Sequence, residues 1–160
     1  MAKRSESITR GAVLLDKTRE KLREAVATVD IVIPAFNEGT CIEGILQDVI
    51  MARQDDWFEI QNIHVISDAS TDQTDDIVQR LARRDQRVKL IRKPERKGKQ
   101  DSINWAFSVT RADIVVFIDA DVRLANEDSI AKLVQHFCDG KTALVQGGLV
   151  RPRPCLISNP

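Results

Sequence analysis

The stretch that decides the fold is Ile114-Val115-Val116-Phe117-Ile118-Asp119-Ala120-Asp121. Five apolar residues run without interruption into two aspartates, a pattern typical of a strand buried on both faces of a parallel sheet. In an extended chain, residues i and i+2 point to the same side, so we expect the carboxylates of Asp119 and Asp121 to converge. Two anionic oxygen donors at the end of a buried strand suit a hard divalent cation that also holds phosphates. The alternative is that both aspartates only cap the strand and begin a turn.

Further strands and helices alternate around this stretch. We expect strands at 29–34, 60–67, 88–91, 114–118 and 142–150. Helices are expected over 42–50, from the caps at 70–72 to about residue 84, from about residue 99, and over 130–137 with a stop at Gly140. In the helix that begins near Lys99, we expect Ile103, Ala106 and Phe107 to share the buried face. This order predicts an α/β fold, a mostly parallel sheet flanked by helices on both faces.

The ends of the chain differ from this central region. Leu15, Leu22 and Val26 stand at helical spacing, so residues 1–28 are expected to form an N-terminal amphipathic helical extension. That helix would pack on the domain or lie on a membrane surface. Residues 29–150 would form the α/β domain, and the proline-containing residues 151–160 would begin a loop that leads onward.

Composition bounds the class of protein. The chain has 160 residues, of which 42% are hydrophobic and 30% charged, so it is long and apolar enough for one globular domain. The formal net charge is +0, which gives no argument for nucleic acid as a partner. Cys41, Cys138 and Cys155 are scattered without a CxxC pair, which favours a reducing compartment over a disulfide framework. No apolar run approaches the roughly 18 residues of a membrane span. We expect a cytoplasmic protein, or one at the inner face of a membrane.

Several common phosphate-site and catalytic motifs are excluded. No G-x-G-x-x-G occurs, so a dinucleotide-binding fold is unsupported. Gly98-Lys99 resembles the end of a P-loop, but Gln100 replaces the required Ser or Thr. No serine lies in a G-x-S-x-G turn, and His64 and His136 fall inside an expected strand and helix, so both are interpreted as structural.

A basic run precedes the central stretch. Between Arg83 and Lys99 there are nine basic residues and two acidic ones. These charges either form a solvated surface or place Arg96, Lys97 or Lys99 against an anionic ligand such as a diphosphate. Lys99 is the strongest candidate because it begins a helix, whose N-terminus favours anions.

Three polar loops follow expected strand ends, at 34–38, 68–72 and 119–121. In parallel α/β sheets, ligands bind at the carboxyl ends of the strands, so these loops are expected to meet at one rim of the sheet. Four pieces of sequence carry this pattern: Val32-Ile33-Pro34-Ala35-Phe36-Asn37-Glu38, Ser67-Asp68-Ala69-Ser70-Thr71-Asp72, Arg96-Lys97-Gly98-Lys99-Gln100-Asp101-Ser102-Ile103-Asn104 and Asp119-Ala120-Asp121.

With these four pieces in order, residues 29–150 resemble the nucleotide-sugar-binding half of glycosyltransferase family 2, which includes chitin, cellulose and dolichol-phosphate sugar synthases. The resemblance implies the GT-A fold, a Rossmann-like nucleotide-diphospho-sugar transferase fold, here apparently truncated. It also implies a metal-dependent, inverting transfer of sugar from a UDP- or GDP-sugar to an acceptor saccharide, hydroxyl or lipid phosphate. The implied cofactor is Mg²⁺ or Mn²⁺. The implied nucleoside-pocket residues are Pro34, Ala35, Asn37 and Glu38.

The same resemblance implies roles for the remaining site residues. Asp68 would accept a hydrogen bond from the base, and Lys99 would lie near base or phosphate. Asp119 and Asp121 would hold the ribose and the metal that bridges the diphosphate. The implied catalytic base, a carboxylate that deprotonates the acceptor, is expected beyond Pro160, so we expect this chain alone to bind donor without useful transfer.

Two departures from the family pattern are visible. The family usually has Asp-Asp-Gly-Ser where this chain has Ser67-Asp68-Ala69-Ser70, which puts the local loop geometry in doubt. Small residues usually follow the Gly-Lys pair, whereas residues 100–102 are larger and polar. Two alternatives stay open: a non-catalytic nucleotide-sugar-binding module, and a sugar-phosphate nucleotidyltransferase, although the Gly-rich N-terminal loop of the latter is missing.

Overall fold

The structure, a computed structural model, describes residues 26–138 and residue 142. The expected strand over 142–150, the helix stop at Gly140 and the loop over 151–160 therefore lie outside the described residues, apart from residue 142. The expected N-terminal helical extension lies outside them up to residue 25.

The described strands form one parallel sheet in the order β3-β2-β1-β4. The strands are β1 (Ala27–Ala35), β2 (Phe58–Ser67), β3 (Val88–Arg92) and β4 (Ile114–Phe117). β1 has a neighbour on each side, since Ile31 pairs with Ile63 of β2 and with Val116 of β4. The expected parallel sheet is confirmed.

Several strand boundaries differ from the sequence-based expectation by one or two residues, including the start of β2 at Phe58 and the end of β3 at Arg92. β1 begins at Ala27, so residues 27 and 28 belong to the sheet and not to a helical extension. Ala27 is held there because it pairs with Phe58 and its N–H donates to the carbonyl of Trp57 at 2.7 Å. β4 ends at Phe117, one residue before the expected end, and lies at the edge of the described sheet.

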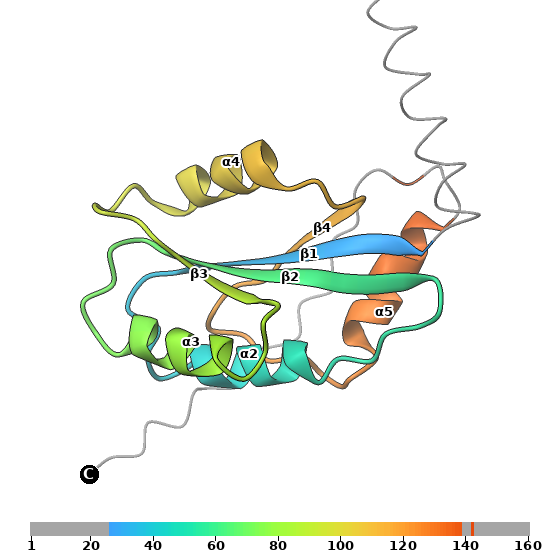
Figure 1. Cartoon of the computed structure of the whole chain (residues 1–160), viewed down its shortest axis with the longest axis horizontal. Coiled ribbons are helices and arrows are strands. Elements are labelled where there is room, and N and C mark those ends of the chain that lie inside the picture. Colours follow the sequence, from blue (N-terminus) through green and yellow to red (C-terminus); the bar gives the residue numbers. More distant parts are fainter. Residues whose placement is uncertain (1–25, 139–141, 143–160) are drawn as a thin grey trace, which may run out of the picture.

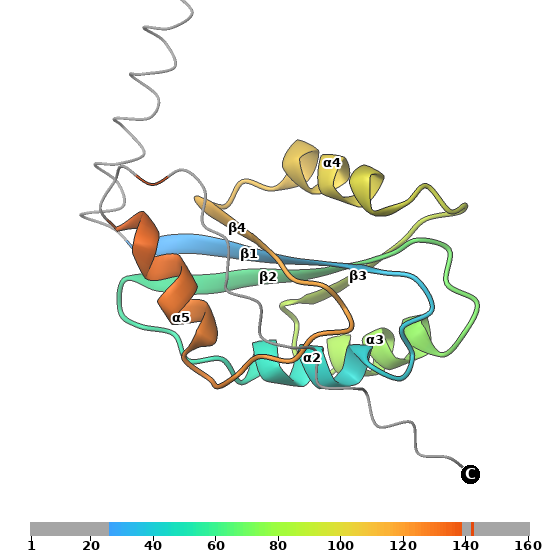
Figure 2. The same cartoon turned by 180° about the vertical axis from the view of Figure 1, so that it is seen from behind.

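Helices cover both faces of the sheet, as expected. α2 (Ile42–Ile50), α3 (Thr74–Ala82) and α5 (Ser129–Val134) lie on one face, and α4 (Lys99–Val109) lies on the other (Figures 1 and 2). α5 gives way to the 3₁₀ turn η1 (Gln135–Phe137), so the expected helix over 130–137 is regular only in its first part. None of the described helices is long and apolar enough to cross a membrane.

The main core lies between the sheet and the helices α2, α3 and α5. Strand residues of period two, including Val29, Ile31 and Ile33, are fully buried against the apolar stripe of α2. That stripe follows the predicted helical spacing, with Ile42, Ile45, Leu46 and Val49 all buried. Burial of apolar area on this face is the main stabilising contribution to the fold.

The opposite face has a smaller core beneath α4. Its buried members are Val32, Ile66 and Ala106. The expectation that Phe107 shares this buried face is wrong, because its side chain is 64% exposed and only touches Phe117 with ring centroids 5.5 Å apart. Ser102 is buried in its place, since α4 turns a partly polar side toward the sheet.

Cys41, at the N-cap of α2, is disulfide-bonded, whereas the cysteine spacing predicted reduced thiols. The prediction was wrong for this residue because spacing along the sequence does not determine which Cβ atoms approach each other in space.

The burial of β1 makes a direct prediction about stability. Ile31→Ala removes a fully buried side chain from the strand that joins both halves of the sheet. We expect the free energy of unfolding to fall by about 2–5 kcal/mol because the site leaves a cavity that cannot collapse. Urea unfolding followed by circular dichroism measures this. Met51→Ala, at a side chain that is 73% exposed, is the matched control and should change stability by less than about 0.5 kcal/mol. Equal effects would contradict the described core.

Candidate functional site

A cavity of about 300 Å³ opens at the rim where the carboxyl ends of the strands meet the start of α4. The register aligns Ala35, Ser67 and Arg92, the last residues of β1, β2 and β3, so the following loops leave the sheet at one edge (Figure 1). All the predicted site residues except Asn37 line this cavity: Pro34, Ala35, Glu38, Asp68, Lys99, Asp119 and Asp121.

Asn37 fixes the loop after β1 and does not line the cavity. Its φ of 56° is left-handed, a conformation that Asn tolerates better than most residues. Its N–H donates to Ser70 Oγ at 3.1 Å, and its Oδ1 accepts from the N–H of Thr71 at 2.8 Å. The residue therefore joins the loop after β1 to the loop after β2, and its implied contact with a nucleoside stays a prediction.

Asp72 and Thr74 form a second tie between these two loops. Asp72 Oδ2 accepts from the N–H of Gly39 at 2.9 Å, and Thr74 Oγ1 accepts from the N–H of Glu38 at 2.8 Å. A Cβ on Gly39 would stand 2.8 Å from Asp72 Oδ2, so a larger residue here would force this carboxylate to shift. Asp72 Oδ1 also accepts from the N–H of Thr74, the first residue of α3, at 3.0 Å, although the N-cap is Gln73 and not one of the expected residues 70–72.

Asp68 is a buried carboxylate, 5% exposed, that holds the basic loop before α4. It accepts hydrogen bonds from the backbone N–H groups of Lys97 at 2.8 Å and Gly98 at 2.7 Å. Burial by itself would raise the pKa of Asp68, but these two hydrogen bonds and the nearby charges of Lys93 and Arg96 outweigh it, so the pKa is lowered. The sequence did not predict this tether, and the implied hydrogen bond from a base to Asp68 stays a prediction.

The loop after β2 departs from the family pattern at Ala69, a position whose backbone conformation favours glycine. Ala69 has a φ of 62°, the left-handed conformation that glycine adopts without a steric penalty. Ser67 is fully buried and its hydroxyl lies 3.1 Å from Ser70 Oγ. The tight turn therefore forms with alanine in place of glycine, and the backbone of Ala69 is strained.

Asp119 and Asp121 reach the cavity by a different route from the one that the sequence predicted. β4 ends at Phe117, and residues 120 and 121 form a turn, so strand alternation does not orient the two carboxylates. The turn is anchored because the N–H of Ile118 donates to the carbonyl of Val32 at 3.0 Å and Ala120 is buried. Both aspartates are exposed and line the cavity, and Lys99 forms an ion pair with Asp119.

Acidic groups crowd one side of the cavity. Burial and the nearby carboxylates of Asp121, Asp72 and Asp119 together raise the pKa of Glu38. Within residues 26–138 and 142, no three His, Cys, Asp or Glu side chains come together closely enough to hold a metal ion by themselves. Asp119 and Asp121 nevertheless fit Mg²⁺ or Mn²⁺, because such ions are commonly held by one or two carboxylates together with water and substrate phosphates.

The other side of the cavity is basic. Arg96 lies over the ring of Phe36, with the guanidinium carbon 3.9 Å from the ring centroid, a cation–π contact. Lys99 is the first residue of α4, as predicted. The lining also includes Arg96, an alternative candidate from the basic run, and four residues that were not predicted: Phe36, Gly98, Ser102 and Ala120. Arg96 was signalled by the basic run and Phe36 by its place in the first motif, whereas nothing in the sequence pointed to Ala120.

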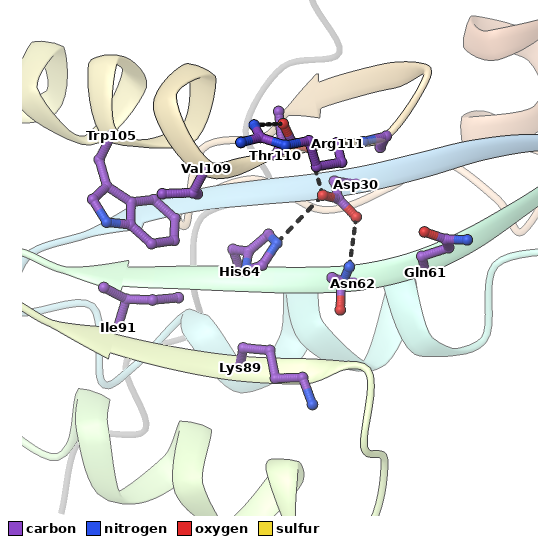
Figure 3. Close-up of a pocket in the computed structure, with 11 residues that line it drawn as sticks. Asp30, Gln61, Asn62, His64, Lys89, Ile91, Trp105, Val109, Thr110 and Arg111 are labelled. Atoms are coloured by element: carbon purple, nitrogen blue, oxygen red, sulfur yellow. Dashed lines mark hydrogen bonds and ion pairs between the residues drawn. The ribbon is translucent and has the colours of Figure 1, made fainter.

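A second cavity, of about 440 Å³, lies on the α4 face of the sheet and contains none of the predicted site residues (Figure 3). Its floor is Asp30, 3% exposed, which accepts from Asn62 at 2.9 Å and from Thr110 Oγ1 at 2.6 Å. His64 Nε2 lies 3.5 Å from Asp30, and the imidazole meets the ring of Trp105 edge-on. These contacts tie the end of α4 to β1 and β2, in agreement with a structural role for His64.

Comparison with known proteins gives consistent matches. The profile of the family described as glycosyl transferase family 2 matches residues 30–156. Glycosyltransferase AglD of Haloferax volcanii is 31% identical over 109 residues, which cover 62% of this chain and 17% of that protein. Glycosyltransferase GlyG of Streptococcus pneumoniae is 26% identical over 125 residues, which cover 74% of this chain and 38% of that protein.

Among solved structures, mannosyltransferase PcManGT from Pyrobaculum calidifontis, in complex with GDP-Man and Mn²⁺, superimposes with a TM-score of 0.62 and 25% sequence identity. The match covers 80% of this chain and 40% of that one. The chain thus spans less than two thirds of the length of each of these three proteins.

The strained turn gives a testable prediction. Ala69→Gly relieves the left-handed strain, so we expect the free energy of unfolding to rise by about 0.5–1 kcal/mol, the net of relieved strain and the entropy that glycine adds to the unfolded chain. Urea unfolding measures it. In the control Ala125→Gly, at a residue whose φ is not positive, glycine should lower stability by about 0.4–1 kcal/mol. A loss of stability in both variants would contradict the described turn.

The acidic side of the cavity gives a prediction about pH. Because the folded pKa of Glu38 is raised, ionised Glu38 destabilises the folded state once the pH exceeds the unfolded pKa. Glu38→Gln should therefore raise stability at pH 7, by less than about 1 kcal/mol because solvent screens the charges. The gain should disappear below about pH 4, where the carboxyl is protonated in both states. Thermal unfolding from pH 3 to 8 tests this, and a gain that is independent of pH would contradict the electrostatic cause.

Proposed function

Because the chain belongs to glycosyltransferase family 2, we propose that it binds a nucleoside-diphosphate sugar at the rim cavity and takes part in the transfer of that sugar. The donor is a UDP- or GDP-sugar, and the transfer proceeds with inversion to an acceptor hydroxyl or lipid phosphate. The single observation that supports this most directly is the shared cavity of Asp119, Asp121, Glu38 and Lys99 at the carboxyl ends of the strands.

The charges of the cavity match the parts of such a donor. Asp119 and Asp121 would hold Mg²⁺ or Mn²⁺, which when bound neutralises the negative charge on the leaving diphosphate. Burial and the nearby carboxylates raise the pKa of Glu38, and a bound cation would offset the repulsion between these carboxylates, which supports a metal at this site. PcManGT, which shares the fold, is seen with GDP-Man and Mn²⁺.

The chain's own residues would orient the two ends of the donor. Lys99, at the N-terminus of α4, would supply a cation for the diphosphate at a helix end that favours anions. Pro34, Ala35 and Asp68 also line the cavity, and the nucleoside would lie against them. Asp68 would accept a hydrogen bond from the base in addition to the two backbone N–H groups, since a carboxylate has about four acceptor positions.

Several finer expectations stay predictions. The catalytic base and the acceptor site stay predictions, so a non-catalytic donor-binding role for this chain stays the alternative. A transfer assay with radiolabelled nucleotide sugars and membrane acceptors separates the two: glycoside formation supports catalysis, and donor binding without product supports the binding role. The acceptor and any membrane association also stay predictions.

Asp121→Asn tests the metal assignment, because it keeps the shape of the side chain and removes its charge. We expect the affinity for UDP or GDP in Mn²⁺ to fall about 10- to 100-fold, the range found when groups around a bound metal are lost. Affinity measured in EDTA should change little. Isothermal titration calorimetry in both buffers gives the comparison.

The matched control is Asp76→Asn, an exposed aspartate in the first turn of α3 and outside the cavity. It should bind nucleotide like the wild type in both buffers. If Asp121→Asn also bound like the wild type in Mn²⁺, the metal assignment would be wrong.

A further inference from the structure

Lys93 is the one lysine or arginine that is buried within residues 26–138 and 142, with 7% of its surface exposed. It directly follows β3, and its N–H donates to the carbonyl of Ser67 at 2.9 Å, next to Asp68. It does not line the rim cavity. A buried ammonium group is costly unless it is paired, so its partners indicate what it does.

Three groups surround the Lys93 ammonium. Nζ donates to Asp101 Oδ2 at 2.6 Å and to Ser102 Oγ at 2.9 Å, both in the first turns of α4. It lies 3.9 Å from Asp68 Oδ1. The ammonium thus joins the loop after β2 to the beginning of α4.

The basic loop 94–98 closes a ring around this contact. The loop begins directly after Lys93. At the other end of the loop, the backbone N–H groups of Lys97 and Gly98 donate to Asp68. Gly98 has a φ of 84°, which lets two successive N–H groups face one carboxylate. Arg96 and Lys99, the cations of the rim cavity, stand within or beside this loop.

Asp101 stands where the family usually has a small residue, and its contact with Lys93 gives a reason for this difference. Asp101 provides the closest acceptor for the buried ammonium, which a small side chain could not do. Replacement of a buried ion pair by apolar residues of similar size is often neutral or stabilising, so stability alone does not explain why a charge is kept here.

We propose that Lys93 is a positioning residue for donor binding. Through Asp68 and Asp101 it holds the loop 94–98 and the first turn of α4, so that Arg96 and Lys99 face the diphosphate of the donor. This role rests on the proposed function, because it assigns the loop to the nucleoside-diphosphate sugar. Lys93 itself does not touch the donor.

Lys93→Met tests the proposal, because it keeps the length of the side chain and removes its charge. We expect the affinity for UDP or GDP in Mn²⁺ to fall about tenfold, the size of one lost charged hydrogen bond. We also expect the amide hydrogens of Lys97 and Gly98 to exchange faster with solvent, while the amides of β1 keep their protection. Lys93→Arg should restore part of both signals. Lys89→Met, at an exposed lysine of β3, is the matched control and should change neither signal.

Asp101→Asn serves if Lys93→Met does not fold, since this side chain is 45% exposed and the substitution is isosteric. It should change both measurements in the same direction, to a smaller extent. The role of Lys93 would be overturned if amide hydrogen exchange at Lys97 and Gly98 were the same in the variants as in the wild type. It would also be overturned if the wild type bound nucleotide and the variants bound it with the same affinity. If the wild type binds no nucleotide while exchange still responds to Lys93→Met, the proposed function fails and the positioning of the loop by Lys93 stands.

Discussion

The pairing of β1 with a parallel neighbour on each side is the constraint on which the rest of the structure depends. Val29, Ile31 and Ile33 are fully buried, so β1 cannot shift its register without moving apolar side chains from one face to the other. Because the strands within the described residues run in the same direction, their carboxyl ends meet at one edge. Residues from positions as distant as Pro34 and Asp121 therefore line one cavity.

Different interactions set the stability of the domain and the geometry of its rim. The core between the sheet and α2, α3 and α5 is apolar, and its burial dominates the free energy of folding. The rim loops carry few apolar contacts and are tied by hydrogen bonds from side chains to the backbone of a neighbouring loop. Asn37, Asp72 and Asp68 each make such a tie. Apolar packing thus brings the loops together, and these polar ties determine the direction in which each loop faces.

The rim cavity carries both acidic and basic side chains. Glu38, Asp119 and Asp121 are its acidic residues, and burial together with the neighbouring carboxylates raises the pKa of Glu38. Arg96 and Lys99 are its basic residues, and Lys99 pairs with Asp119. In a donor bound together with a metal ion, the cation would complement the acidic residues and the diphosphate would complement the basic ones. In the proposed function, Asp119 would hold the metal, and Lys99 would then contact the phosphates.

The sequence by itself determined the α/β class, the parallel sheet with helices on both faces, and the rim at which polar residues gather. These features are local or periodic: apolar runs predict strands, helical stripes predict α2, and strand ends predict the position of Asp119 and Asp121. The tertiary structure alone decided that β4 ends at Phe117 and that a turn carries the aspartates. It also decided that Phe107 is exposed, that Cys41 is disulfide-bonded and that Lys93 is buried beside Asp68. Each of these depends on contacts between residues distant in the chain, and no local pattern contains that information.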